Sequence, residues 1–111
     1  MIKISFSKQR LRGVNWYEVT ATGHASYAPQ GQDIVCAAVS ILLTTLAEMI
    51  SQFHESNNAL LDEADLRSGK AHLRFALESA GEEAVETTVT GLKLIAASYP
   101  ENCELKLSGV G

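Results

Sequence analysis

Hydrophobic and polar residues alternate along several short stretches of the chain, which is the pattern of a β-strand with one buried face. The first stretch alternates from Ile2 to Ser7. A polar connection over residues 8–13 separates it from a second strand, expected at about 14–22, which has apolar residues on both faces. We therefore expect a partner chain to cover one of those faces. Three later stretches predict a hairpin around Ser68-Gly69 and a final strand: 59–67, 70–77 and 103–107.

Two longer segments have apolar residues at helical spacing. The first runs from Ile34 to Phe53 without Gly or Pro, and it is apolar around so much of its circumference that we expect burial on more than one side. The second follows Gly81, has acidic residues in its first turns, and is stopped by Pro100. The order ββαββαβ predicts an α/β fold of the α+β type, with two helices packed on a mostly antiparallel sheet of four to five strands.

Size and charge limit the possible functions. The chain has 111 residues and a mass of 12.0 kDa, so we expect a single domain spanning residues 1–111. The formal net charge of −4 gives the molecule no electrostatic reason to seek nucleic acid, and we expect no direct nucleic-acid binding.

The same sequence argues against a membrane and against a metal. No stretch approaches the roughly 18 consecutive apolar residues of a membrane-spanning helix, and Lys3, Ser5 and Ser7 interrupt any signal-peptide run. We therefore expect no membrane association and a cytoplasmic location, where thiols stay reduced. Two cysteines without C-x-x-C spacing give little support to a disulfide or a zinc site, and we expect neither metal nor cofactor.

The candidate chemistry lies in a turn-rich stretch, Gly23 to Ser40, which opens with a histidine and closes in an apolar helix. Asp33 stands just before the first apolar residue of that helix, where its side chain can accept hydrogen bonds as an N-cap. Cys36 is then the third helical residue, near the positive end of the helix dipole, which favours a thiolate over a thiol. The carboxylate of Asp33 opposes this effect if it faces the sulfur.

A nucleophilic thiolate needs a general base, most often histidine, and His24 lies nearest to Cys36 in sequence. The spacing alone leaves open that both residues only fill the fold, because buried cysteine is a common small hydrophobic residue. The other histidines are poorly placed, with His54 in a helix-terminal turn and His72 on the polar side of its strand. Cys103 lies on an apolar strand face and is expected in the core.

The run Gly23-His24-Ala25, then Gly31 and Asp33-Ile34-Val35-Cys36-Ala37-Ala38-Val39-Ser40, resembles the signature of the ribosomal-processing cysteine proteases, the Prp family. The resemblance extends to the start MIKISF, the second helix and the final strand. It implies a small homodimeric endopeptidase that removes the short N-terminal extension of a large-subunit ribosomal protein, a step needed for ribosome assembly. It also implies a substrate segment that ends in bulky apolar residues.

By this resemblance the catalytic cysteine and histidine are Cys36 and His24, and the supporting residues are Gly23, Asp33 and Ser40. Ser26 stands where the family commonly has Gly, Asn or Asp. The loop between the two catalytic residues is expected to act as a lid that orders over the substrate. It comprises Ala25, Ser26, Tyr27, Ala28, Pro29, Gln30, Gly31 and Gln32.

The expected mechanism is attack of the Cys36 thiolate on the scissile carbonyl, with His24 moving the proton. Backbone N–H groups at the start of the helix, including that of Cys36, are expected to bind the oxyanion. Asp33 is one candidate to orient His24, although its role as a cap competes with this. Two other interpretations stay open: a non-catalytic ribosome-assembly or peptide-binding module, and another Cys–His acyl-transfer hydrolase such as a small thioesterase or deamidase.

Overall fold

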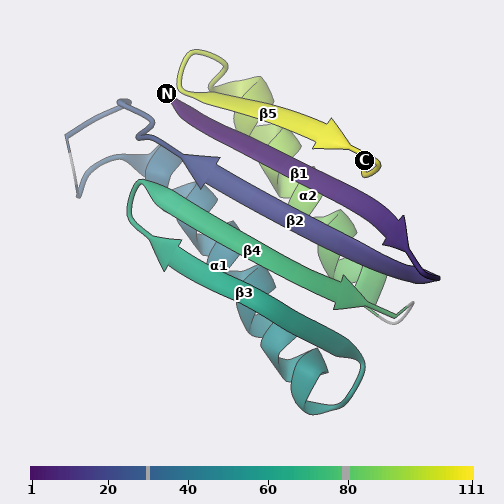
Figure 1. Ribbon diagram of the computed structural model, residues 1–111. Coiled ribbons are helices and arrows are strands. Elements are labelled where there is room, and N and C mark those ends of the chain that lie inside the picture. Colours follow the sequence, from purple (N-terminus) through teal and green to yellow (C-terminus); the bar gives the residue numbers. More distant parts are fainter. Residues whose placement is uncertain (30, 79–80) are drawn as a thin grey trace.

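The computed structural model describes residues 1–29, 31–78 and 81–111 and contains one five-stranded sheet (Figure 1). The strand order is β3-β4-β2-β1-β5. Neighbouring strands are antiparallel except for β1 and β5, which run parallel with Ile2 opposite Cys103. The strands are β1 (Ile2–Leu11), β2 (Val14–Thr22), β3 (Ala59–Arg67), β4 (Lys70–Leu77) and β5 (Cys103–Ser108).

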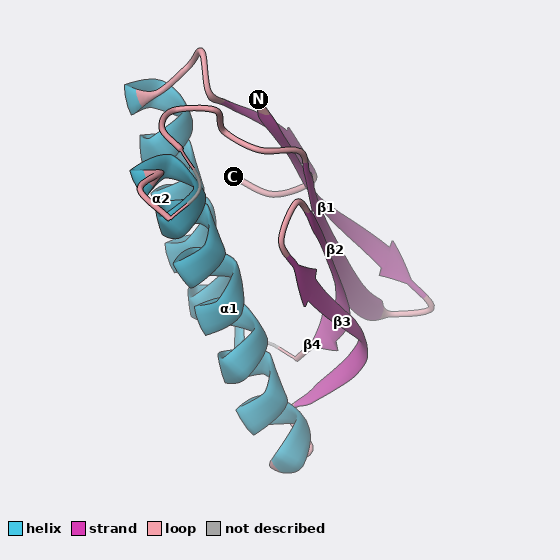
Figure 2. Cartoon of the chain, turned by 90° about the vertical axis from the view of Figure 1, so that its left-hand side faces the viewer, coloured by secondary structure: helices cyan, strands magenta, loops and turns pink. Residues whose placement is uncertain are grey.

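Helices α1 (Ile34–Glu55) and α2 (Glu82–Ser98) cover one face of this sheet and leave the other face open (Figure 2). The core between the two layers is built from the inward side chains of the strands and from one stripe of each helix. Its largest fully buried members are Phe6, Phe75, Ile4, Leu46, Ile50, Leu73, Leu92, Val19, Val35 and Cys103. The predicted α+β fold, with two helices on a mostly antiparallel sheet in the order ββαββαβ, is therefore confirmed.

The first hairpin is longer than the sequence indicated. We expected a polar connection over residues 8–13, but β1 continues to Leu11 and only Arg12 and Gly13 form the turn, both at positive φ (51° and 78°). The polar residues at the end of β1 remain in the sheet because they pair with β2. The aliphatic chain of Lys8 also carries its ammonium to 5.8 Å from the centre of the Tyr17 ring. The alternation of apolar and polar residues therefore predicted too short a strand, because the last residues of β1 are exposed to solvent.

Helix α1 is fully buried on one stripe and partly buried on the side that faces α2, so the expectation of burial on more than one side is met only in part. Ile34 and Ile41 are 53% and 62% exposed, whereas every residue of the inward stripe is buried: Val35, Val39, Leu43, Leu46 and Ile50. Helix α2 covers only part of the remaining surface. It comes close to α1 at Gly91, where a Cβ atom would lie 2.8 Å from Cδ1 of Leu42.

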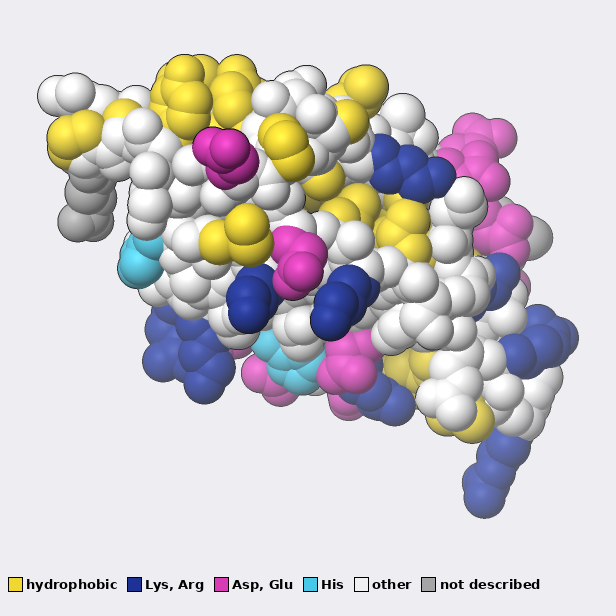
Figure 3. Space-filling view, turned by 90° about the horizontal axis from the view of Figure 1, so that it is seen from above, with side chains coloured by type: hydrophobic (Ala, Val, Ile, Leu, Met, Phe, Trp, Pro, Cys, Tyr) yellow, Lys and Arg dark blue, Asp and Glu magenta, His cyan; other side chains and the backbone are white. Residues whose placement is uncertain are grey.

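By length and composition α1 could cross a membrane, since an 18-residue window within its 22 residues has a mean hydropathy of 2.0. This differs from the expectation drawn from uninterrupted apolar runs. The core helix of a soluble protein has the same property, and α1 packs its apolar stripe against the sheet. The helix side of the molecule is accordingly rich in apolar side chains, while charged side chains gather on the open face of the sheet (Figure 3).

Candidate active site

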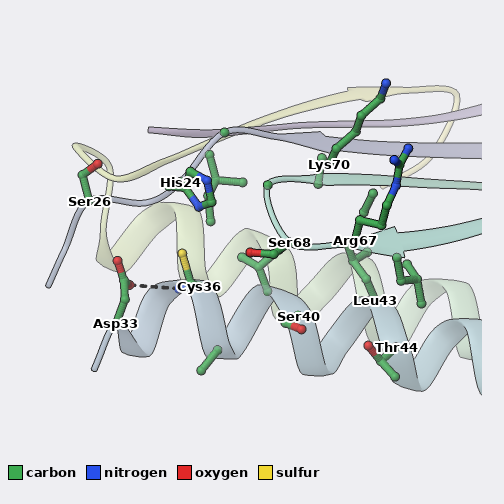
Figure 4. Close-up of a pocket in the computed structure, with 18 of the residues that line it drawn as sticks. His24, Ser26, Asp33, Cys36, Ser40, Leu43, Thr44, Arg67, Ser68 and Lys70 are labelled. Carbon is green, nitrogen blue, oxygen red and sulfur yellow. Dashed lines mark hydrogen bonds between the residues drawn. The ribbon is translucent and has the colours of Figure 1, made fainter. Parts of the chain in front are cut away.

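A cavity of about 580 Å³ lies where the end of β2, the start of α1 and the turn between β3 and β4 meet. His24 reaches it from the segment after β2, and Cys36 reaches it from the first turn of α1 (Figure 4). Gly23, Asp33 and Ser40 line the same cavity. The fold thus gathers at one place the five residues that the sequence singled out from the stretch between Gly23 and Ser40.

Asp33 is the N-cap of α1, as the sequence predicted. Its Oδ1 accepts hydrogen bonds from the backbone N–H groups of Val35 and Cys36, each at 3.0 Å, and its Oδ2 accepts from Tyr27 and Ala28 at 3.0 and 3.4 Å. The hydrogen bond from the Cys36 N–H is the largest cause that lowers the pKa of this carboxyl, and the other three N–H groups lower it further. One carboxylate therefore fixes both the helix start and the loop before it.

This arrangement changes two of our expectations. The N–H of Cys36 is engaged by Asp33 and is not open to an oxyanion. Both carboxylate oxygens of Asp33 are also occupied by backbone donors, so the cap takes precedence over a role in orienting His24. Among the residues that the structure describes, no hydrogen bond joins Asp33 to His24.

The half-buried sulfur of Cys36 accepts a hydrogen bond from the backbone N–H of Ala25, with 3.4 Å between nitrogen and Sγ. Cys36 is the third residue of α1, as predicted, because the helix begins at Ile34. The donor belongs to the residue that follows His24, so the segment after β2 contacts the sulfur directly.

His24 is exposed, and its ring packs against the β3–β4 turn. An ideal Cβ on Gly69 would lie 2.9 Å from Nε2 of His24, so the ring occupies space that only a glycine leaves free. The N–H of Gly23 donates to the carbonyl of Gly69 at 3.0 Å, which fastens the two segments together. Within the described chain no hydrogen bond joins His24 to Cys36; the two side chains share the cavity (Figure 4).

The predicted lid is attached to the rest of the molecule at several points. Ala25 is buried, and its carbonyl accepts a hydrogen bond from Nδ2 of Asn102 at 2.9 Å. The Tyr27 ring meets the Tyr99 ring edge-on at 5.3 Å between centres. Ser26 has a φ of 57°, a conformation that Gly, Asn and Asp adopt more readily than Ser. Gln30, also in the predicted lid, lies outside the described residues.

The other two histidines and the second cysteine lie away from the cavity and make structural contacts. His72 pairs with Glu18 at 2.6 Å on the open face of the sheet, and Nδ1 of His54 accepts from the N–H of Leu61 at 3.2 Å. Cys103 is buried, and this burial raises the pKa of its thiol. In the described ranges, no three His, Cys, Asp or Glu side chains come together as a metal site would require.

Nothing in the sequence indicated that Gly69 and Asn102 support the site. Gly69 was recognised as a turn residue, but the pattern gave no sign that its missing side chain makes room for His24. Asn102 lies in the turn between α2 and β5, 77 positions away from Ala25. No spacing rule connects residues so distant, because their contact depends on how the whole chain packs.

Comparison with known proteins agrees with this geometry. A family model described as cysteine protease Prp matches residues 1–104. The chain belongs to the Prp family of cysteine proteases. A ribosomal processing cysteine protease Prp from Mycoplasma pneumoniae is 32% identical over 93 residues, which cover 79% of this chain and 84% of the relative.

Solved structures resemble the Prp fold found here. Staphylococcus aureus Prp with a covalently linked product peptide has a TM-score of 0.73 at 24% identity, covering 96% of this chain and 99% of that one. The same S. aureus protease with a substrate peptide has a TM-score of 0.65 at 25% identity, with coverage of 96% and 99%. A Streptococcus mutans protein has a TM-score of 0.67 at 26% identity and covers 98% and 95%.

Proposed function

We propose that this chain is a cysteine endopeptidase in which Cys36 is the nucleophile and His24 is the general base and acid. Its proposed substrate is a large-subunit ribosomal protein, from which it removes a short N-terminal extension. The observation that supports this most strongly is that His24 and Cys36 line one cavity in a chain of the Prp family. The names of the relatives support the substrate class, because one is a ribosomal processing protease and another was solved with a substrate peptide.

In the proposed first half-reaction, His24 takes the thiol proton of Cys36 and the sulfur attacks the scissile carbonyl carbon. The S–C bond forms as the carbonyl π electrons move to oxygen. When the carbonyl re-forms, the C–N bond breaks and the leaving amine takes the proton from His24. The extension is then held on Cys36 as a thioester.

In the second half-reaction, a water molecule gives a proton to His24 and attacks the thioester. The S–C bond breaks, the extension leaves with a carboxyl end, and the proton returns to the sulfur. The N–H of Ala25, which donates to the Cys36 sulfur at 3.4 Å, is the proposed donor to the oxyanion in both steps. It takes the role that we first expected for the N–H of Cys36, which Asp33 engages.

The proposal has further parts that follow from the family resemblance. We propose that the chain acts as a single domain and as a homodimer in the cytoplasm. We also propose that the loop from Ala25 to Gln32 closes over the substrate as a lid, and that Gly23 and Ser40 support the site. The cavity is adjacent to this loop, because Ser26, Ala28 and Gly31 contribute to its lining.

The decisive experiment incubates the protein with an extended ribosomal protein from the same organism and measures product masses. We expect one cut at the end of the extension, with loss of cleavage in Cys36→Ala and His24→Ala and retention in Cys103→Ala. A thiol-reactive peptide analogue should attach to Cys36 in the intact protein. Cleavage that persists in Cys36→Ala would refute the nucleophile assignment. Peptide binding without cleavage would favour a binding module, and hydrolysis only of thioesters or side-chain amides would favour another acyl-transfer hydrolase.

A further inference from the structure

The turn between α2 and β5 reaches the candidate active site through one side chain. Nδ2 of Asn102 donates to the carbonyl oxygen of Ala25 at 2.9 Å. The N–H of the same Ala25 residue donates to the sulfur of Cys36 at 3.4 Å. A chain of two hydrogen bonds therefore runs from Asn102 to the sulfur through a single residue that is only 1% exposed.

The backbone of Asn102 is fixed without this side chain. Its N–H donates to the carbonyl of Tyr99 at 3.0 Å, and its carbonyl accepts from the N–H of Ile2 at 2.9 Å. These contacts hold the turn against α2 and β1 whatever side chain stands at position 102. Replacing the side chain thus removes the bond to Ala25 and leaves the supports of the turn in place.

Among the described residues, Asn102 is the only side chain that donates a hydrogen bond to the carbonyl of Ala25. Ala25 follows His24, whose ring is confined on one side by Gly69, and it precedes Ser26, which holds a φ of 57°. A segment with this local strain returns to its relaxed conformation unless the surrounding structure holds it. The bond from Asn102 opposes that relaxation at the residue whose N–H must face the sulfur.

We propose that Asn102 is a positioning residue, which holds Ala25 so that its N–H points at the Cys36 sulfur and at the oxyanion that forms there. This inference rests on the proposed function. Asn102 does not touch the reacting atoms. It acts by fixing the donor and, through the adjoining peptide, the position of His24. Misplacing a catalytic group by about 1 Å can reduce the rate by about 100-fold, so a single distant hydrogen bond is sufficient to matter.

The test uses a single-thiol parent, Cys103→Ala, in which alkylation reports on Cys36 alone. Asn102→Ala removes the donor, and Asn102→Asp removes it while keeping the shape of the side chain. Glu101→Ala is the matched control, since it changes the exposed neighbour in the same turn. All proteins are assayed well below their melting temperatures, on the extended ribosomal protein for kcat and KM, and with iodoacetamide at pH 7 for the alkylation rate.

Both Asn102 variants should lose about 10- to 100-fold in kcat with little change in KM. Alkylation of Cys36 should slow about 3- to 10-fold, the loss expected when one hydrogen bond to the sulfur weakens. Glu101→Ala should match the parent in both assays. The inference is overturned if kcat stays within about twofold of the parent, or if kcat falls while alkylation keeps its rate. If the single-thiol parent itself does not cleave, the proposed function fails, and the alkylation series still decides whether Asn102 acts on the sulfur.

Discussion

Gly69 packs so closely against His24 that a Cβ atom on Gly69 would lie only 2.9 Å from Nε2 of the imidazole. Gly69 comes from the β3–β4 turn, and His24 follows β2. The backbone bond from the Gly23 N–H to the Gly69 carbonyl holds them at this separation. The hairpin therefore forms one wall of the site and limits where the imidazole can lie.

Gly69→Ala should consequently reduce cleavage by about 10-fold or more, because the added methyl group pushes the imidazole away from its place. The glycine also has a φ of 77°, so alanine should cost roughly 1 kcal/mol of stability by itself. Gly13→Ala is the matched control, since Gly13 has a φ of 78° with nothing within 4 Å of its added Cβ. We expect equal losses of stability in thermal unfolding and a loss of activity only in Gly69→Ala; equal activity in the two would remove the positioning role.

The lowered pKa of the Asp33 carboxyl predicts how the free energy of unfolding depends on pH in the acid range. Its pKa is lowered in the folded chain from an ordinary value of 3.8, so below that pH the unfolded chain binds a proton that the folded chain excludes. The stabilisation by the charged cap is complete above about pH 4 and is lost as the pH falls through the lowered value. Urea unfolding between pH 2 and 5 should show this loss, and Asp33→Asn should flatten that part of the curve. An unchanged curve in Asp33→Asn would show that other carboxyls cause the acid dependence.

Cys103 predicts how stability changes at alkaline pH. Burial raises the pKa of its thiol above the ordinary 9.0, so above that pH the unfolded chain loses a proton that the folded chain keeps. Stability should therefore decline as the pH rises past 9.0, and Cys103→Ala should reduce this slope while costing about 1 kcal/mol in lost packing. A thiol reagent should label Cys36 in the native protein and Cys103 only after unfolding. Rapid labelling of both would contradict the burial of Cys103.

Substitutions at two residues of α1 test which side of the helix is buried and which is exposed. Leu46 is fully buried, so Leu46→Ala should lower the free energy of unfolding by about 2–5 kcal/mol. Ile41 is 62% exposed, and Ile41→Ala should change the free energy by less than about 0.5 kcal/mol in a dilute sample. Chemical denaturation measures both. A large effect of Ile41→Ala that grows with protein concentration would mean that a second chain covers this side of the helix.

The sequence predicted most of the fold because its local signals agree with one another. The bounds of β2 and of the β3–β4 hairpin follow from alternation that stops at Gly or at a polar pair, and α1 follows its cap at Asp33. The end of β1 was missed because Lys8, Gln9 and Arg10 break the alternation of apolar and polar residues, although they remain in the sheet by pairing with β2.

The site was only partly predictable for a related reason. His24, Asp33 and Cys36 lie in one stretch, so their proximity follows from a loop and a helix start. The supports at Gly69 and Asn102 come from distant turns, and their contribution depends on long-range packing. The role of Asp33 was predicted as a cap, but only the geometry showed that the cap engages the N–H of Cys36.

The parallel pairing of β1 with β5 has a consequence for when the protein can fold during translation. The segment that carries His24 and Cys36 is synthesised before the turn that tethers Ala25 and before β5, the strand that pairs with β1. A nascent chain that stops before Asn102 therefore has both reactive side chains but lacks the hydrogen bond that holds Ala25. Activity should therefore arise only after β5 has been made and has paired with β1.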